Sequence, residues 1–292
     1  MAIFPTNLDL EILGSGGAFA TPRVGCCCDV CREAYERGIP YARSGPSTFL
    51  HGPDVLFDTP EESRDQLVRA NITRVQACFY SHWHPDHVMG RRVWESLNFD
   101  ARTWPPHHRT TDIYLPAQVS LDFRERLGSW DHLQFLEQTG IVRLHTVDDG
   151  DAVMIDGVTI TPIRLAEDYV YAFLIERDDT RILLAMDELH GWTPPADLGP
   201  LDLAVLPIGV FAHHPLTGER LIAADHPVLR EEATFDDTIA IARRLNVREV
   251  IFSHIEASDE LGHDTLLAVA TQLRADGLPA TIAFDGLRRP VR

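Results

Sequence analysis

Apolar and polar positions along the chain predict strands that alternate with helices. Residues 8–13 alternate apolar and acidic side chains, as a half-buried strand does, and a glycine-rich turn (GSGG) follows them. Three apolar runs, the last two separated by an Asp178-Asp179 turn, predict antiparallel strands over 158–163, 171–176 and 181–186. The C-terminal part predicts helix, strand, helix and strand in turn, over 236–245, 249–253, 264–273 and 280–286. These elements indicate the α/β class, with mixed layers.

In the first half of the chain, one stretch has a clear strand-to-helix pattern and another has no regular pattern. Over 55–71 the pattern changes from strand to helix, with Thr59 as the predicted N-cap, Pro60 at the first helical position and Glu62 completing a capping box. Residues 91–140 are the least regular, because RTWPPHHRTTD combines paired prolines with polar residues. No linker divides the chain, so we predict one domain over 1–292 with an irregular insertion at about 91–140.

Length and charge restrict the class of protein. The 292 residues, 45% of them hydrophobic, can bury a full core, and a net charge of −18 disfavours a partner such as nucleic acid. A small anionic substrate remains possible if metals supply positive charge. No apolar stretch approaches the roughly 20 residues of a membrane span, and the N-terminus lacks the features of a signal peptide. We therefore expect a cytoplasmic protein with no membrane partner.

A histidine-rich loop carries the first chemical signal. The predicted strand ACFYS (77–81) runs directly into HWHPDH, which places four potential ligands within six residues: His82, His84, Asp86 and His87. Imidazole and carboxylate are ligands that zinc, manganese and iron accept, and a tight loop at a strand end can aim them at one point. The pattern predicts a metal site.

Two more strand ends fit the same site. The predicted strand over 181–186 runs into Asp187, and the one over 249–253 runs into His254. Such residues converge if their strands lie side by side, because α/β folds build sites at strand ends. They would supply a bridging carboxylate and a sixth ligand, enough for two divalent metals about 3.5 to 4 Å apart.

Together these motifs resemble the metallo-β-lactamase superfamily of hydrolases. The shared features are HxHxDH after a strand, an upstream FDT with Asp58, a later strand-end Asp and a last strand-end His, and the resemblance spans Leu10 to Gly286. It implies an αββα sandwich with the metals at one edge of the two sheets.

Four of the five cysteines lie in GCCCDVC, at the start of a loop over 25–34. In a reducing cytoplasm such clusters are metal ligands or redox groups more often than disulfides. The loop is similar to the superfamily branch that includes the cyclic-phosphate phosphodiesterase of carbon–phosphorus lyase operons, where a C-x-C-x-x-C loop holds a structural zinc. Cys26, Cys28 and Cys31 match that spacing, whereas Cys27 should point elsewhere; a redox pair is the competing interpretation.

The fourth ligand of this zinc is less clear from the sequence. The branch has a His three positions after its last catalytic His, and Ala257 stands there in this chain. His263, at the start of the helix predicted over 264–273, is our substitute, with Glu256 behind it.

The chain also departs from the family near its first metal. The family has a further His at the end of the strand that corresponds to 158–165, and RLAEDYVYAF contains none. Glu167 or Asp168 could replace it, which would shift the preferred metal from zinc towards manganese or iron. The alternative is a site with one weak metal or none.

The resemblance and the ligand set predict a metal-dependent hydrolase, most simply a phosphodiesterase for a small phosphodiester, linear or cyclic. A hydroxide bridging the two metals would be the nucleophile, with Asp86 in the catalytic loop. His226 is the candidate general acid, with His213 and His214 as alternatives. The other options are an ester, lactone or thioester hydrolase, or a metal-binding cofactor-pathway protein with a decayed site. Two kinds of partner are considered: the small anionic substrate, and a second copy of the chain in a homodimer.

Overall fold

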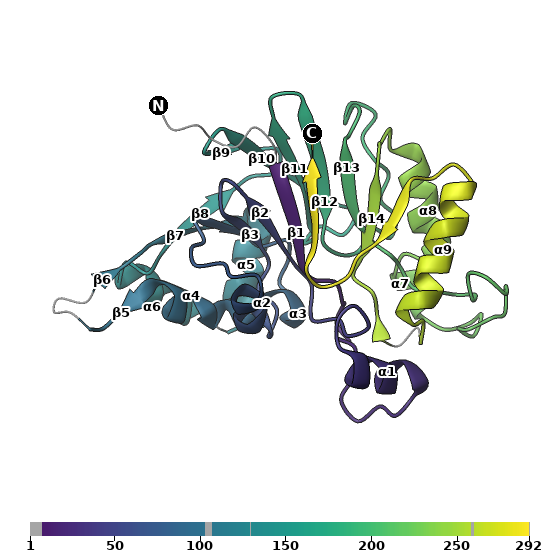
Figure 1. The fold of residues 1–292 in the computed structure, drawn as a ribbon. Helices are drawn as coiled ribbons and strands as arrows, with labels where there is room; N and C mark the ends of the chain where they lie inside the picture. Colours follow the sequence, from purple (N-terminus) through teal and green to yellow (C-terminus); the bar gives the residue numbers. More distant parts are fainter. Residues whose placement is uncertain (1–7, 103–106, 129, 258–259, 292) are drawn as a thin grey trace.

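Two seven-stranded sheets pack face to face in the computed structural model, with helices on both outer sides (Figure 1). The structure describes residues 8–102, 107–128, 130–257 and 260–291. This is the predicted αββα sandwich. The α/β fold class is thereby confirmed.

The first sheet has the strand order β16-β1-β2-β3-β4-β7-β8. It is antiparallel from β16 to β3 and parallel from β3 to β8. Its strands are β1 (Leu8–Gly14), β2 (Ser47–His51), β3 (Val55–Phe57), β4 (Ala77–Phe79), β7 (Thr111–Pro116), β8 (Val142–Val147) and β16 (Leu287–Val291). Its outer face is covered by α2 (Ser63–Arg69), α4 (Val93–Asn98), α5 (Ala117–Glu125) and α6 (Trp130–Gln138).

The second sheet has the order β15-β14-β13-β12-β11-β10-β9, antiparallel from β9 to β12 and parallel beyond. Its strands are β9 (Val153–Ile155), β10 (Val158–Arg164), β11 (Tyr171–Arg177), β12 (Thr180–Ala185), β13 (Leu203–Pro207), β14 (Val250–Ser253) and β15 (Ala280–Ile282). The helices α8 (Phe235–Arg244) and α9 (His263–Ala275) cover its outer face.

Shorter elements complete the fold. The helix α1 (Asp29–Arg37) projects below the sandwich in the view of Figure 1. The others are α3 (Pro85–Val88), the 3₁₀ helix η1 (Met89–Arg92), the pair β5 (Phe99–Asp100) and β6 (His107–His108), and α7 (Val228–Glu231). No helix in the described ranges is long and apolar enough to span a bilayer.

Alternating apolar positions explain how the sheets pair. Leu8, Leu10 and Ile12 of β1 point between the sheets, where they pack with Phe173 and Ile175 of β11. Burying such side chains stabilises the fold by about 1.5–3 kcal/mol each. The strands β4, β12 and β14, each paired in parallel on at least one side, contribute apolar residues to both faces, so their polar residues are confined to the strand ends. This confinement places the chemistry at one edge of the sandwich.

The strands and helices predicted from periodicity in the second half are confirmed, including the antiparallel β10, β11 and β12. The predicted capping box is wrong, because α2 begins at Ser63 after Glu62, which makes no side-chain cap. Thr59 instead shares a 2.8 Å hydrogen bond with the hydroxyl of buried Tyr80. This hydrogen bond holds the Thr59 side chain beside Tyr80, just after β4, so it does not cap α2.

The predicted irregularity of 91–140 is also wrong for the described residues. This stretch forms η1, α4, β7, α5 and α6 and contributes buried side chains such as Trp94 and Phe123 to the core. Prolines and polar residues do not exclude regular structure when flanking apolar positions can pack on a sheet. The paired prolines themselves, at 105–106, lie outside the described residues.

Candidate metal centre and its pocket

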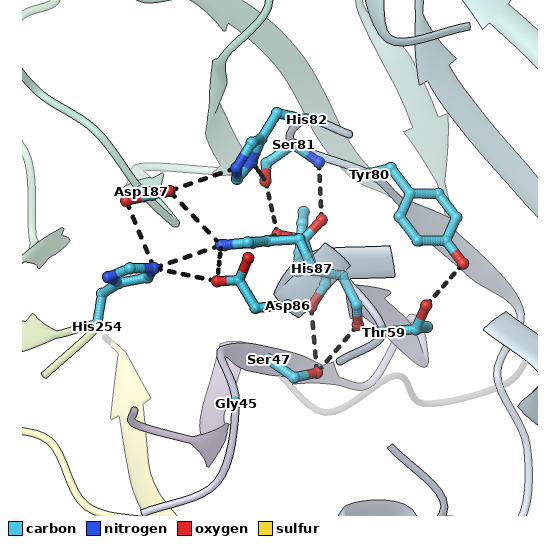
Figure 2. A network of polar contacts seen from close by, with 12 residues as sticks. Gly45, Ser47, Thr59, Tyr80, Ser81, His82, Asp86, His87, Asp187 and His254 are labelled. Carbon is cyan, nitrogen blue, oxygen red and sulfur yellow. Dashed lines mark hydrogen bonds and ion pairs between the residues drawn. The ribbon is translucent and has the colours of Figure 1, made fainter. Parts of the chain in front are cut away.

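The strand-end ligands converge at one edge of the two sheets (Figure 2). Oδ2 of Asp187, after β12, lies 3.3 Å from Nε2 of His82, after β4. The other oxygen of Asp187 lies 3.4 Å from Nε2 of His254, after β14. Nε2 of His254 is in turn 3.4 Å from Nε2 of His87. Donor atoms of one metal are separated by such distances, since each lies about 2.0–2.2 Å from the ion.

Two overlapping groups of possible ligands result. His82, His87 and Asp187 form one group, and Asp86, His87 and His254 form the other; within each, the ligand atoms lie within 4.8 Å of one another. Asp187 contacts histidines of both groups through its two oxygens. A carboxylate so placed can bridge two cations.

The side chain of His82 shows that the donor set fits a metal. It is fully buried, and its Nε2 has no hydrogen-bond partner. Its Nδ1 lies 3.0 Å from the hydroxyl of Ser81, which itself donates to Asp58. The hydroxyl must therefore accept from Nδ1–H, which leaves a lone pair on Nε2. That lone pair faces Oδ2 of Asp187 at 3.3 Å, an arrangement that is costly in a buried site unless a cation lies between the two atoms.

Asp58 orients the loop from behind. This fully buried residue follows β3 with a φ of 60°, and accepts hydrogen bonds from Ser81 N at 2.8 Å and from Ser81 Oγ at 2.6 Å. It also accepts one from Nδ1 of His87 at 2.7 Å. A carboxylate behind a histidine fixes the tautomer and makes the outer nitrogen a better metal ligand.

The ionisable side chains of this cluster shift one another's pKa values strongly. Burial alone would raise the pKa of Asp187, but His254 and His82 lower it well below its usual range. Burial would lower the pKa of His254, yet Asp187 and Asp86 raise it to about 9. The carboxylates thus remain ionised and hold positive charge beside them, a field that also favours metal cations.

A cavity of about 260 Å³ opens beside these ligands. Three residues of the ligand groups line it, namely Asp86, Asp187 and His254, and so does His84, which was predicted as a ligand but belongs to neither group. Further lining comes from Phe19, from the turn with Glu167 and Tyr169, from Glu188 and Leu189, from Glu256, and from four residues around α7: Val228, Glu231, Glu232 and Ala233. The cavity is therefore a candidate substrate pocket.

The pocket walls do not come from the stretch that is least regular in sequence. Residues 91–140 and the HHPLTGERL loop contribute none of the described lining, which comes partly from α7 instead. His226 is exposed and outside this lining; its Nδ1 accepts a 3.1 Å hydrogen bond from Val228 N, which ties the ring to its own turn. His213 and His214 line a separate cavity with Phe235. The prediction of a general acid among these histidines is thus not supported by their positions.

The turn after β10 places three consecutive side chains differently. Backbone hydrogen bonds from Leu165 to Val170 and from Val170 to Glu167 close this turn. Glu167 is half-buried and lines the pocket but belongs to neither ligand group, whereas Asp168 is exposed. The ring of Tyr169, which the sequence did not single out, lies 5.6 Å from that of His84. Glu167 is thus the better placed acid, although the structure does not make it a ligand.

Glu188 is another pocket residue that sequence reasoning missed. Burial, and then a hydrogen bond to Glu232, raise its pKa to about 9. Its Oε1 accepts a 3.1 Å hydrogen bond from Ala233 N, so it joins the end of β12 to the chain after α7. In the sequence, its position next to the predicted ligand Asp187 is what could have indicated that Glu188 lines the pocket.

The cysteine loop forms a second cluster, remote in sequence from the first. The thiols of Cys26, Cys28 and Cys31 lie within 4.8 Å of one another, and exposed Cys27 is outside the group. Backbone and thiol hydrogen bonds of Cys28 lower the pKa of Cys26 to about 7. Burial raises the pKa of Cys31 to about 11. The three cysteines chosen by their spacing in the sequence therefore lie together in the structure, as three donors that suit zinc.

The predicted fourth ligand of this cluster is not confirmed. His263 is buried outside the thiol group, and its ring packs edge-on against Tyr41 at 5.5 Å because α9 lies beside the chain after α1. Glu256 is also committed elsewhere. It accepts 2.9 Å hydrogen bonds from Ala18 N and Phe19 N, at the pocket beside His254.

Comparisons with known proteins agree with this architecture. The chain is 29% identical over 157 residues to an octanoyltransferase of Porphyromonas gingivalis; the match covers 53% of this chain but only 30% of that protein. It is 24% identical to ribonuclease Z of Myxococcus xanthus, over 83% of this chain and 90% of the relative.

Solved structures with the same fold cover nearly the whole chain. A diphosphatase from the PhnP family aligns with a TM-score of 0.67 and 24% identity, over 97% of both chains. Zn²⁺-bound PqqB from Methylobacterium extorquens aligns with a TM-score of 0.71 and 13% identity, over 96% of this chain and 99% of that one. Residues 52–255, which contain all the strand-end ligands, match the family model for the beta-lactamase superfamily domain. The chain therefore belongs to the metallo-β-lactamase superfamily.

Proposed function

We propose that this protein is a hydrolase that uses two divalent metals to cleave a small phosphodiester. The observation that carries the proposal is the convergence of Asp187, His82, His87 and His254 around a buried, unpartnered nitrogen beside a pocket. His82, His84 and Asp187 would hold one metal, and Asp86, His87, His254 and Asp187 the other. Glu167 is our candidate to complete the first site. Zinc, manganese and iron all suit these donors.

Bound metals would supply Lewis acidity, which lowers the pKa of a coordinated water and neutralises negative charge on the substrate. The chain's own residues do the positioning. Asp58 and Ser81 hold His82 and His87 with their outer nitrogens facing the site. Glu256, held by two backbone N–H groups, lies 3.8 Å from Nδ1 of His254. The ligands are therefore preorganised before any substrate binds.

The relatives support phosphate-ester chemistry, since one is named a diphosphatase and another ribonuclease Z. The net charge of −18 argues that this chain's substrate is smaller than a nucleic acid. For the cysteine loop we propose a structural zinc held by Cys26, Cys28 and Cys31.

A second candidate is the hydrolysis of an uncharged ester, lactone or thioester. It is favoured by one observation: no arginine or lysine occurs among the described residues that line the pocket. The same metal chemistry serves carbonyl centres.

The test is turnover by protein whose metal content has been measured. Protein loaded with zinc, manganese or iron is assayed with bis(4-nitrophenyl) phosphate and with 4-nitrophenyl acetate. We expect faster metal-dependent cleavage of the diester, and its loss in Asp187→Ala but not in Asp197→Ala, an exposed acid outside the pocket lining. Preference for the acetate would favour the second candidate. No turnover with two metals bound would contradict both and favour a decayed site.

A further inference from the structure

A turn near the N-terminus holds the backbone of His254, the last ligand of the second metal group. The turn comprises residues 15–19, directly after β1. Ile255 N donates a 3.0 Å hydrogen bond to Ser15 O, and Ala257 N donates one of 3.0 Å to the carbonyl at the other end of the turn. His254 itself has a φ of 53°, a left-handed conformation that costs a histidine free energy. The turn therefore holds His254 in a conformation that it would not keep alone.

Gly17, in the middle of this turn, leaves room for the His254 ring. A Cβ atom on Gly17 would lie 2.7 Å from both Nδ1 and Cε1 of His254, and 2.2 Å from Oε1 of Glu256. Cβ atoms essentially never come closer than 3.0 Å to such atoms. The φ of Gly17 is not left-handed, so space rather than backbone conformation requires glycine here. The Nδ1 edge of the ring thus faces Gly17, while Nε2 faces Asp187 at 3.4 Å (Figure 2).

Asp285 ties the start of the turn to the segments around the first sheet. This buried residue lies between β15 and β16, and its Oδ1 accepts hydrogen bonds of 2.9 Å from both N and Oγ of Ser15. Its Oδ2 accepts from N of Ser44 at 3.0 Å and from Oγ of Ser44 at 2.5 Å, and lies 3.2 Å from Nη2 of Arg69. Hydrogen bonds to a carboxylate are about twice as strong as those between neutral groups. One side chain therefore fixes Ser15, whose carbonyl holds Ile255.

We propose that Gly17 and Asp285 are positioning residues for His254, and that they set how tightly the second metal is held. This inference rests on the two-metal site of the proposed function and deepens it. Gly17 acts on the ring directly, because a side chain there would displace Nδ1 and, with it, Nε2. Asp285 acts at a distance, through Ser15 O and Ile255 N, on the backbone that carries the ring. Neither residue belongs to the described lining of the pocket.

The effect of these two positions should be confined to one metal. Of the two ligand groups, only the one with Asp86 contains His254. A general loosening of the fold would weaken both metal sites. Selective weakening of one ion therefore distinguishes positioning of His254 from loss of stability.

Gly17→Ala is the direct test, since it keeps the backbone hydrogen bonds of the turn and the atoms in its way belong to side chains that can move. In competition with a chromogenic chelator, we expect the affinity for one ion to fall about 10- to 100-fold and that for the other to stay within about threefold. Hydrolysis of bis(4-nitrophenyl) phosphate should fall at low free metal and recover at high free metal. Gly262→Ala is the matched control, because the nearest neighbour of a Cβ there would be 3.6 Å away.

A double-mutant cycle shows whether the effect passes through His254. Adding Gly17→Ala to His254→Ala should cause no further loss of metal affinity, because the ring that Gly17 positions is already gone. Asp285→Asn is the second variant, since an amide offers one acceptor oxygen in place of two. Asp276→Asn, at an exposed acid after α9, is its control. Near-ultraviolet circular dichroism of the metal-free proteins checks the fold, and Gly17→Ala decides alone if Asp285→Asn does not fold.

Three results would contradict positioning by this turn while the phosphodiesterase proposal stands. They are wild-type affinity for both ions in Gly17→Ala or in folded Asp285→Asn, equal weakening of both ions, and a further loss in the double variant. If the wild-type protein binds two metals and cleaves no diester, the phosphodiesterase proposal fails, and the metal affinities of the variants still decide this inference.

Discussion

Asp58 accepts a 2.7 Å hydrogen bond from Nδ1 of His87, and both side chains are fully buried. Asp58 follows β3, whereas His87 lies in α3, the short helix after β4, so the contact joins the segments that follow two neighbouring parallel strands. The same carboxylate binds Ser81, which contacts His82. One residue therefore orients a histidine from each ligand group.

Asp58→Asn should weaken metal binding without removing a ligand. An amide is a poorer acceptor for Nδ1–H and cannot accept all the present hydrogen bonds, so we expect affinity to fall about 10- to 100-fold. Competition with a chromogenic chelator would measure this loss. The matched control is Asp54→Asn, outside this network. Wild-type affinity in Asp58→Asn would show that the contact does not position the histidines.

His84→Ala should lower hydrolysis at least about 100-fold while the fold persists, since a lost ligand removes metal chemistry worth several kcal/mol. His84 is only half-buried and belongs to no core cluster, so near-ultraviolet circular dichroism should be unchanged. His226→Ala is the control, because that exposed ring lies outside the pocket lining. A similar loss of activity in both variants would argue against these assignments.

Glu167→Gln should reduce the metal content from two ions to one at the active site if Glu167 completes the first position. Glu167→His should then retain zinc more tightly, since imidazole is the softer donor. Asp168→Asn, at the exposed neighbour, should change neither. Mass-spectrometric metal analysis after gel filtration gives the stoichiometry. Two ions in Glu167→Gln would leave the first site completed by another group.

Replacing Cys26, Cys28 or Cys31 by Ser should release one zinc and lower the melting temperature by about 5–10 °C, because structural zinc binding is coupled to folding. Cys27→Ser should do neither, since this exposed thiol lies outside the group. Calorimetry with metal analysis on all four variants distinguishes the two classes. Equal effects at all four positions would contradict the assigned spacing.

His263→Phe should keep that zinc and improve stability in acid. Burial, and then the charge of Arg43, lower the pKa of His263, so the folded protein favours the neutral ring. Its stabilising contribution is therefore present above the unfolded pKa of about 6.5 and is lost as the pH falls through the lower folded value. Melting temperatures between pH 7 and pH 5 should fall more steeply for wild type. Zinc loss in the variant would instead make His263 a ligand.

The sequence alone determined the layers and most of the ligand set. Periodicity is local, so β10, β11, β12, α8 and α9 could be predicted from neighbouring positions. The ligands could be predicted because each directly follows a buried strand, and parallel strands end at a common edge. His82, Asp187 and His254 are of this kind.

Only the tertiary structure decided what surrounds those ligands. His226 and His263 carry suitable nitrogens, but packing turns the first to solvent and buries the second against Tyr41. Glu188 and Glu232, separated by more than forty positions, become partners because the chain after α7 returns to the end of β12. Such contacts depend on how loops cross the sheet edge, where no periodic pattern restrains them. Local patterns can therefore predict the metal ligands, whereas the pocket that selects a substrate depends on long-range packing.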